Sequence, residues 1–102
     1  DDMLIIRGVN LYPSHIEALL VGFPGIAPHY QLVVTRQGSL DQLCIQVEAS
    51  ASVDVDRSML AAKIRHHVKS LGGVSCEVEV MAPGSVPRSE GKAVRVRDLR
   101  HP

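Results

Sequence analysis

The stretch YQLVVTRQGSLDQLCIQVEA, from Tyr30 to Ala49, decides the fold of this chain. It holds two runs rich in β-forming residues, 30–36 and 43–49, separated by the polar segment 37–42. Two such runs predict a β-hairpin with a somewhat long loop. In the second run apolar residues alternate with more polar ones. The alternation predicts an open sheet with one buried face and one wetter face.

Two helices flank this hairpin in the expected order of elements. The first begins at Pro13, whose missing N–H suits a first helical turn, and Phe23-Pro24-Gly25 stops it. The second is capped by Asp54 or Asp56, runs to Leu71 and ends at Gly72-Gly73 in the left-handed position. Its buried stripe is expected to comprise Leu60, Ile64, Val68 and Leu71.

Two further strands complete the pattern. A short apolar strand at 3–7 precedes the first helix, followed by a turn at 8–10, and an alternating strand at 74–81 follows the second helix. The order β-α-β-β-α-β predicts an α+β, ferredoxin-like or ACT-like fold, with a four-stranded antiparallel sheet and both helices on one face. The 102 residues form one domain, with a C-terminal extension beyond the last strand.

The extension contains the segment Pro87-Arg88-Ser89-Glu90-Gly91-Lys92. Its Pro, Gly and Ser content predicts an exposed, mobile loop from 84 to 91. A Walker-type phosphate loop needs Gly and Ser or Thr where this chain has Val86 and Ala93, so that motif is excluded. The chain has zero formal net charge, yet the segment from Arg88 to His101 contains five basic residues and only two acidic ones. A tail of this kind suits phosphate groups.

Composition narrows the class of partner. Three aromatic residues and no overall basic excess argue against nucleic-acid binding. No apolar run approaches the ~20 residues of a membrane span. Cys44 and Cys76 stand alone in strand-like runs, which favours small buried side chains over a metal or a disulfide. The histidines are scattered, so no metal site is assigned. Because the sequence shows neither a membrane span nor a signal-peptide pattern, a cytoplasmic domain is expected.

The two ends of the chain together resemble the C-terminal domain of adenylate-forming ligases, in particular the phenylacetate-coenzyme A ligase family. The resemblance rests on the N-terminal segment 1–17, on the loop 87–92, and on two segments between them that occur in the same order, 28–33 and 83–87. The chain begins with Asp1 and covers one domain, so it is expected to be the lid of a larger enzyme whose N-terminal domain is absent.

The resemblance implies specific roles. Such ligases join an aryl carboxylate to AMP from ATP, with Mg²⁺ accompanying the ATP, and then transfer the acyl group to coenzyme A. Lys92 would be the catalytic lysine of the first step, within a phosphate loop of Arg88, Ser89 and Gly91. Arg7, Gly8, Val9 and Asn10 would form the coenzyme A side for the second step. Asp1 would mark the hinge, and the isolated lid would be inactive and bind no cofactor.

Alternatives differ in class. An ACT-like regulatory module shares the order of elements and binds small molecules across a dimer interface, but it has no need of the loop 87–92. The lid of an F420-adenylating relative would keep that loop. The RNA-recognition fold is disfavoured by the lack of strand aromatics. Which aryl acid is activated, and whether the protein forms a homodimer, stay open.

Overall fold

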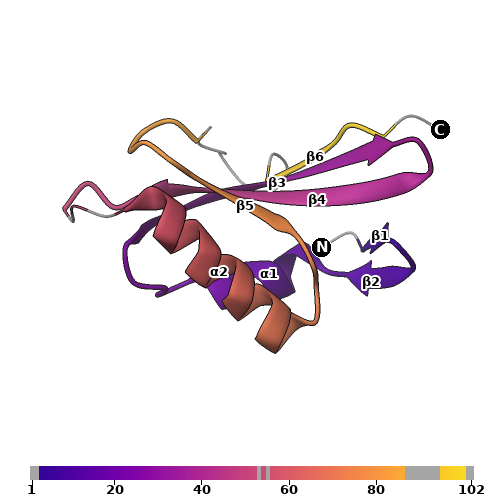
Figure 1. Ribbon diagram of the computed structural model, residues 1–102, viewed down its shortest axis with the longest axis horizontal. Coiled ribbons are helices and arrows are strands. Elements are labelled where there is room, and N and C mark those ends of the chain that lie inside the picture. Colours follow the sequence, from indigo (N-terminus) through magenta and orange to yellow (C-terminus); the bar gives the residue numbers. More distant parts are fainter. Residues whose placement is uncertain (1–2, 53, 55, 87–94, 101–102) are drawn as a thin grey trace.

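A computed structural model of the chain describes residues 3–52, 54, 56–86 and 95–100. The order of elements is β1 (Leu4–Ile6), β2 (Val9–Leu11), α1 (Pro13–Leu20), β3 (Ile26–Gln37), β4 (Leu40–Ala49), α2 (Arg57–Gly72), β5 (Glu77–Met81) and β6 (Val96–Asp98). Both helices lie on one side of the main sheet, as expected, and the β1–β2 hairpin lies on that side too (Figure 1).

The main sheet has four strands in the order β5-β4-β3-β6. The α+β class and the four strands are confirmed, but the antiparallel arrangement is correct only for β3 and β4. Strand β5 runs parallel to β4, and β6 runs parallel to β3. Helix α2 supplies the crossover that a parallel pair such as β4 and β5 requires.

The strand expected at 3–7 is present as β1, but it does not join the main sheet. After β1 the chain reverses in a two-residue turn at Arg7-Gly8 and pairs with β2, with Ile6 opposite Val9. In the segment 8–10, expected as a turn, only Gly8 lies in the turn, and Val9 and Asn10 belong to β2. The sheet edge beside β3 is occupied by β6, from the C-terminal tail.

The central hairpin is longer than the sequence predicts. Strand β3 begins at Ile26, with an irregular register before Tyr30, and Gln37 pairs with Leu40 across a two-residue turn. The expected long loop is therefore a tight turn, in which Gly38 adopts a φ of 62°. Two-residue turns need positive φ at a central residue, and glycine supplies it at no steric cost.

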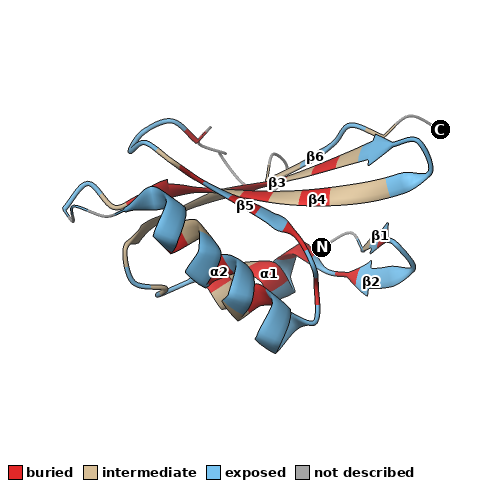
Figure 2. Cartoon of the chain, in the orientation of Figure 1, coloured by how far each residue is buried: buried red, intermediate tan, exposed pale blue. Residues whose placement is uncertain are grey.

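The core lies between the sheet and the helices (Figure 2). Leu32, Val34, Ile45 and Val47 from the central strands are fully buried against Ile64 and Val68 of α2 and Ile16 of α1. The apolar stripes are confirmed except at Leu71, which is 68% exposed. Leu71 falls in the last turn of α2.

Asp56, one of the two expected caps, begins α2. Its Oδ1 accepts hydrogen bonds from the N–H groups of Ser58 and Met59, at 3.0 and 3.1 Å. Gly73 ends the helix with a φ of 71°, as expected for a left-handed C-terminal residue.

We expect Asp56→Ala to destabilise the domain by about 1 kcal/mol, because two amide groups of the first turn lose their acceptor. Urea unfolding of the chain measures the change. Asp54→Ala, an exposed carboxylate two residues earlier, is the matched control and should stay within about 0.5 kcal/mol of the parent. Equal losses in the two variants would contradict the assignment of Asp56 as the cap.

Candidate functional site

The expected coenzyme A side is the tip of the β1–β2 hairpin. Arg7 and Gly8 are the two central residues of its turn, with φ values of 51° and 76°. Positive φ at both positions is the mark of a type I′ turn, which matches the twist of a hairpin. Arg7 is the single residue other than glycine with positive φ among those that the structure describes. Such a conformation costs roughly 1–2 kcal/mol, so surrounding contacts must hold it.

Contacts to the main sheet hold this turn. Arg7 Nε donates a hydrogen bond to the backbone carbonyl of Asp41 at 2.7 Å. Arg100 Nη1 donates to the carbonyl oxygen of Ile5 at 2.7 Å and to Asp41 Oδ2 at 2.9 Å. The hairpin is thereby fixed both to β4 and to the C-terminal tail.

Asp41 is the centre of this arrangement. Its side chain is 13% exposed, and Arg36 Nε lies 2.6 Å from Oδ1. Hydrogen bonds from Arg36 and then from Arg100 lower the pKa of the Asp41 carboxyl. Asp41 therefore stays ionised at neutral pH, and it pairs with Arg100 of the basic tail, which the sequence analysis had associated with phosphate groups.

The remaining residues expected on this side, Val9 and Asn10, lie on β2 with exposed side chains. A Cβ added to Gly8 would meet nothing within 4 Å inside the domain. Positive φ, and not crowding within this domain, therefore explains the glycine. Space above the turn remains for another molecule or domain.

A groove of about 590 Å³ lies next to the turn. Its lining includes three basic side chains, those of Arg7, Arg65 and Lys69, and also Cys76 and Glu77. Arg65 Nη1 lies 3.8 Å from Glu77 Oε2. The groove is large enough for part of a ligand, and its net positive charge favours an anionic one.

The expected adenylation residues Arg88, Ser89, Gly91 and Lys92 lie outside the described residues, as does the expected hinge, Asp1. The structure describes both flanks of the lysine segment instead. The upstream flank ends at Val86 and the downstream flank begins at Arg95.

The upstream flank is a turn that folds back over the outer face of the sheet. In it Ser85 N donates to Ala82 O at 3.2 Å, with Pro83 and Gly84 as the central residues and a Gly84 φ of 82°. Proline followed by glycine at these positions is typical of a type II turn. Gly84 and Ser85 are exposed as expected, but Val86 is 1% exposed, so the expectation of an exposed loop from 84 to 91 is wrong at Val86.

Glu48 holds this turn. Its side chain is on the outer face of β4, where the residue is 1% exposed. Oε1 accepts from the N–H of Gly84 at 2.8 Å, and Oε2 accepts from the N–H of Val86 at 2.9 Å. Sequence reasoning missed Glu48, because an acidic residue at a wetter-face position gives no sign of what will cover it.

The downstream flank is held by Arg95. Its guanidinium forms an ion pair with Glu17 of α1 and lies over the Tyr30 ring, 5.2 Å from the centroid. Its carbonyl accepts from Leu32 N at 2.7 Å, at the start of β6. Burial raises the pKa of the Tyr30 hydroxyl, so the ring stays neutral beside the cation.

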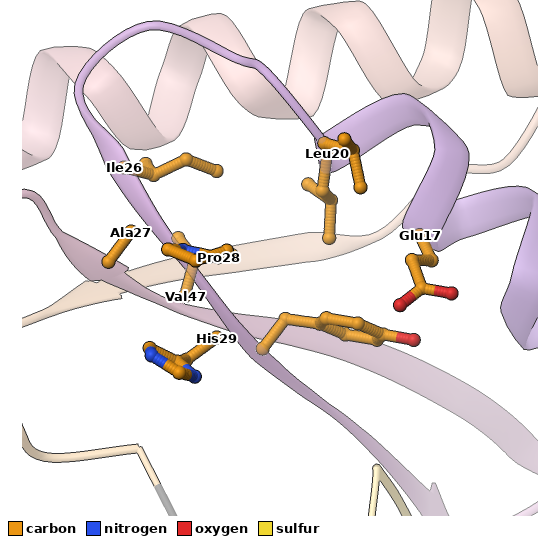
Figure 3. A pocket seen from close by; sticks show the side chains of 9 residues that line it. Glu17, Leu20, Ile26, Ala27, Pro28, His29 and Val47 are labelled. Carbon is orange, nitrogen blue, oxygen red and sulfur yellow. The ribbon is translucent and has the colours of Figure 1, made fainter. Parts of the chain in front are cut away.

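The small cavity next to this cluster is not a substrate pocket. It measures about 30 Å³ and is lined by Glu17 and Leu20 of α1 and by residues 26–30 of β3, among others (Figure 3). That volume suits about one water molecule, whereas ligand pockets usually exceed 300 Å³. A ligand the size of a nucleotide or an aryl acid does not fit in this cavity.

Other expected features can be located. Cys76 is buried and Cys44 half-buried, and burial raises the pKa of both thiols, that of Cys76 to about 11. Among the described residues, no group of His, Cys, Asp and Glu could hold a metal ion. No helix in the described part of the chain is long and apolar enough to span a membrane.

Comparison with known proteins identifies the class of domain. The family model for the AMP-binding enzyme C-terminal domain matches residues 8–100, so the chain belongs to that family. Gly8, strand β2 and both flanks of the lysine segment fall within this match. The ACT-like and RNA-recognition alternatives are thereby set aside.

The individual relatives are ligases. The chain is 49% identical to phenylacetate-coenzyme A ligase of Escherichia coli (strain K12) over 99% of its length, and 43% identical to that of Thermus thermophilus over 98%. It spans about a quarter of these proteins, 24% and 26% respectively. The chain is thus similar to one domain of a much longer enzyme.

Solved structures agree. A domain of phenylacetate-coenzyme A ligase from Bacteroides vulgatus superposes with a TM-score of 0.88 at 33% identity, covering 99% of this chain and 95% of that one. 2-Hydroxyisobutyryl-CoA ligase in complex with 2-HIB-AMP and CoA, in the thioesterification state, gives a TM-score of 0.85 at 38% identity, covering 98% of this chain and 22% of that chain. The mixed sheet described above is therefore the fold of this family of domains.

Proposed function

We propose that the chain is the C-terminal lid of an aryl-CoA ligase of the phenylacetate-coenzyme A ligase type. The observation that carries the proposal is the 49% identity to such a ligase over 99% of the chain. The whole enzyme would couple cleavage of ATP to AMP and pyrophosphate with formation of an aryl-CoA thioester. The partner that completes it is the N-terminal domain of the same enzyme.

In the first half-reaction, a carboxylate oxygen of the aryl acid attacks the α-phosphorus of ATP. The new O–P bond replaces the bond to pyrophosphate, which leaves with its electron pair, and Mg²⁺ accompanies the nucleotide. Lys92 would bridge the carboxylate and phosphate oxygens as negative charge builds up between them. Gly91 would let the backbone approach, and Arg88 and Ser89 would face the phosphates.

In the second half-reaction, the coenzyme A thiolate attacks the acyl carbonyl carbon and AMP leaves. The Arg7-Gly8 turn would line the path of the thiol, and Val9 and Asn10 on β2 would flank it. The exposed side chains of Ile5 and Val9, 52% and 46% exposed, provide apolar surface for the pantetheine arm. The cationic groove beside Arg7 suits the phosphates at the other end of coenzyme A.

Two half-reactions on two parts of one small domain require the lid to change orientation, with Asp1 at the hinge. The relative 2-hydroxyisobutyryl-CoA ligase has been solved in a thioesterification state, in a postadenylation state and in an open conformation, and this chain resembles a domain of all three. That set of states supports the two-orientation proposal. We place the whole enzyme in the cytoplasm, and its mass in solution would decide whether it is a homodimer.

The test is the whole enzyme supplied with ATP, coenzyme A and a panel of aryl acids. Pyrophosphate release that depends on the acid, followed by thioester formation that depends on coenzyme A, is the expected result. An F420-adenylating relative would release pyrophosphate without forming an aryl thioester. Such an outcome would replace the aryl-CoA assignment with that alternative.

The isolated domain should not bind ATP with micromolar affinity, because the adenine and ribose pockets are expected on the N-terminal domain. Calorimetric titration of this chain with ATP and Mg²⁺ measures the affinity, and the whole enzyme under the same conditions is the control. Micromolar binding by the isolated chain would show that it is a nucleotide-binding module in its own right.

A further inference from the structure

Among the residues that the structure describes, Glu48 is the most deeply buried charged residue, at 1% exposed, and the proposed chemistry does not use it. Its two oxygens accept hydrogen bonds from the backbone N–H groups of Gly84 and Val86, which lie 36 and 38 residues later in the chain. These hydrogen bonds hold the turn that follows β5 against the outer face of β4; Figure 1 shows the path of the chain. Glu48 of β4 pairs with Met81, the last residue of β5, so the chain that leaves β5 turns back over the neighbouring strand β4.

Stability alone is a poor reason for this arrangement. Taking a carboxylate out of water carries a large desolvation penalty, which hydrogen bonds to both oxygens offset. An apolar side chain would cover the same sheet face without the penalty. A carboxylate does what an apolar residue cannot, because it specifies the direction of two particular amide groups and hence the path of the backbone.

The path that Glu48 fixes is the start of the lysine segment. Val86, whose amide it binds, is six residues before Lys92. The type II turn with Gly84 at a φ of 82° brings the two amides onto one carboxylate. We infer that Glu48 is a positioning residue for the adenylation half-reaction, acting through the backbone at Gly84 and Val86 on the placement of Lys92. The inference rests on the proposed function of Lys92.

The matched variants are Glu48→Gln and Glu79→Gln in the whole enzyme. Glutamine keeps the shape of the side chain but places an NH₂ group against one of the two amides, so one hydrogen bond becomes a contact between donors. Glu79 lies on the outer face of the neighbouring strand β5, is exposed and accepts from Gln46 Nε2 at 3.1 Å. It undergoes the same chemical change away from the turn.

Glu48→Gln should lower kcat for acyl-adenylate formation roughly tenfold, within the ~10²-fold that a displacement of about 1 Å costs. The KM for ATP should stay unchanged. Thioester formation from supplied acyl-adenylate should stay within about twofold of the parent enzyme. Glu79→Gln should leave both steps unchanged. A loss shared equally by the two steps would mean that Glu48 only keeps the domain folded, and would overturn the inference.

A double-mutant cycle with Lys92→Ala gives the decisive readout. If Glu48 acts through Lys92, then Glu48→Gln should cause no further loss of adenylation once the lysine is absent. Losses that multiply would overturn the inference. Full adenylation by Glu48→Gln beside slow adenylation by Lys92→Ala would overturn it and leave the proposed function standing, whereas an unaffected Lys92→Ala would overturn the proposed function itself.

Discussion

Lys92→Ala in the whole ligase should slow acyl-adenylate formation by at least ~10²-fold, the scale of one preorganised donor at a developing charge. The physical reason is that the ammonium is needed where two anionic groups meet, and water in its place is not held in position. Pyrophosphate release in a single turnover measures this step. Transfer of the acyl group from supplied acyl-adenylate to coenzyme A should be nearly unchanged.

A matched control for Lys92→Ala is Lys69→Ala. Lys69 is exposed at the end of α2 and lines the groove beside Arg7, so it belongs to the side expected to face coenzyme A. Its removal should leave adenylation intact. If both lysines affected adenylation alike, the effect of Lys92 would reflect net charge and not a placed ammonium.

Gly8→Leu should produce the opposite pattern, with thioester formation slowed roughly 10²-fold and pyrophosphate release preserved. A Cβ added at Gly8 meets nothing within 4 Å inside the domain, so the leucine side chain is expected to project from the turn toward whatever approaches it. Obstructing a reacting thiol by about 1 Å is enough for a loss of this size. Thioester formation from synthetic acyl-adenylate measures the step.

Backbone strain requires its own control, because leucine at a φ of 76° costs stability wherever it occurs. Gly22→Leu provides it, since Gly22 has a φ of 77° and a Cβ there also meets nothing within 4 Å. The two variants should lose similar stability in urea, and Gly22→Leu should keep both half-reactions. Slow thioester formation in Gly22→Leu as well would reassign the effect of Gly8→Leu to strain.

The local pattern of the sequence predicted the elements well and their assembly less well. The alternation in 43–47 and the stripe of Ile64 and Val68 are set by periodicity, and the structure has both, whereas Glu48, expected on the wetter face, is buried. Strand directions are not encoded locally. Three residues of the tail, β6, take the sheet edge beside β3, and nothing in VRD distinguishes them from a solvated terminus.

In the candidate site too, local features could be predicted and long-range contacts could not. Gly8 could be singled out because a glycine directly after a short apolar run indicates a turn, and the structure adds that Arg7 shares its positive φ. Glu48 and the Glu17–Arg95 ion pair could not be found, because their partners are 36 to 78 residues away in the chain. Long-range contacts of this kind are decided by packing, which periodicity does not report.

We propose that one lid serves two half-reactions with two different parts of its surface. Both half-reactions can be measured in the same preparations of Lys92→Ala and Gly8→Leu enzyme. We expect a crossed result, in which the first variant is slow only in adenylation and the second only in thioester formation. If each variant slowed both steps by the same factor, the two parts of the surface would not be separate sites, and the proposal would be wrong.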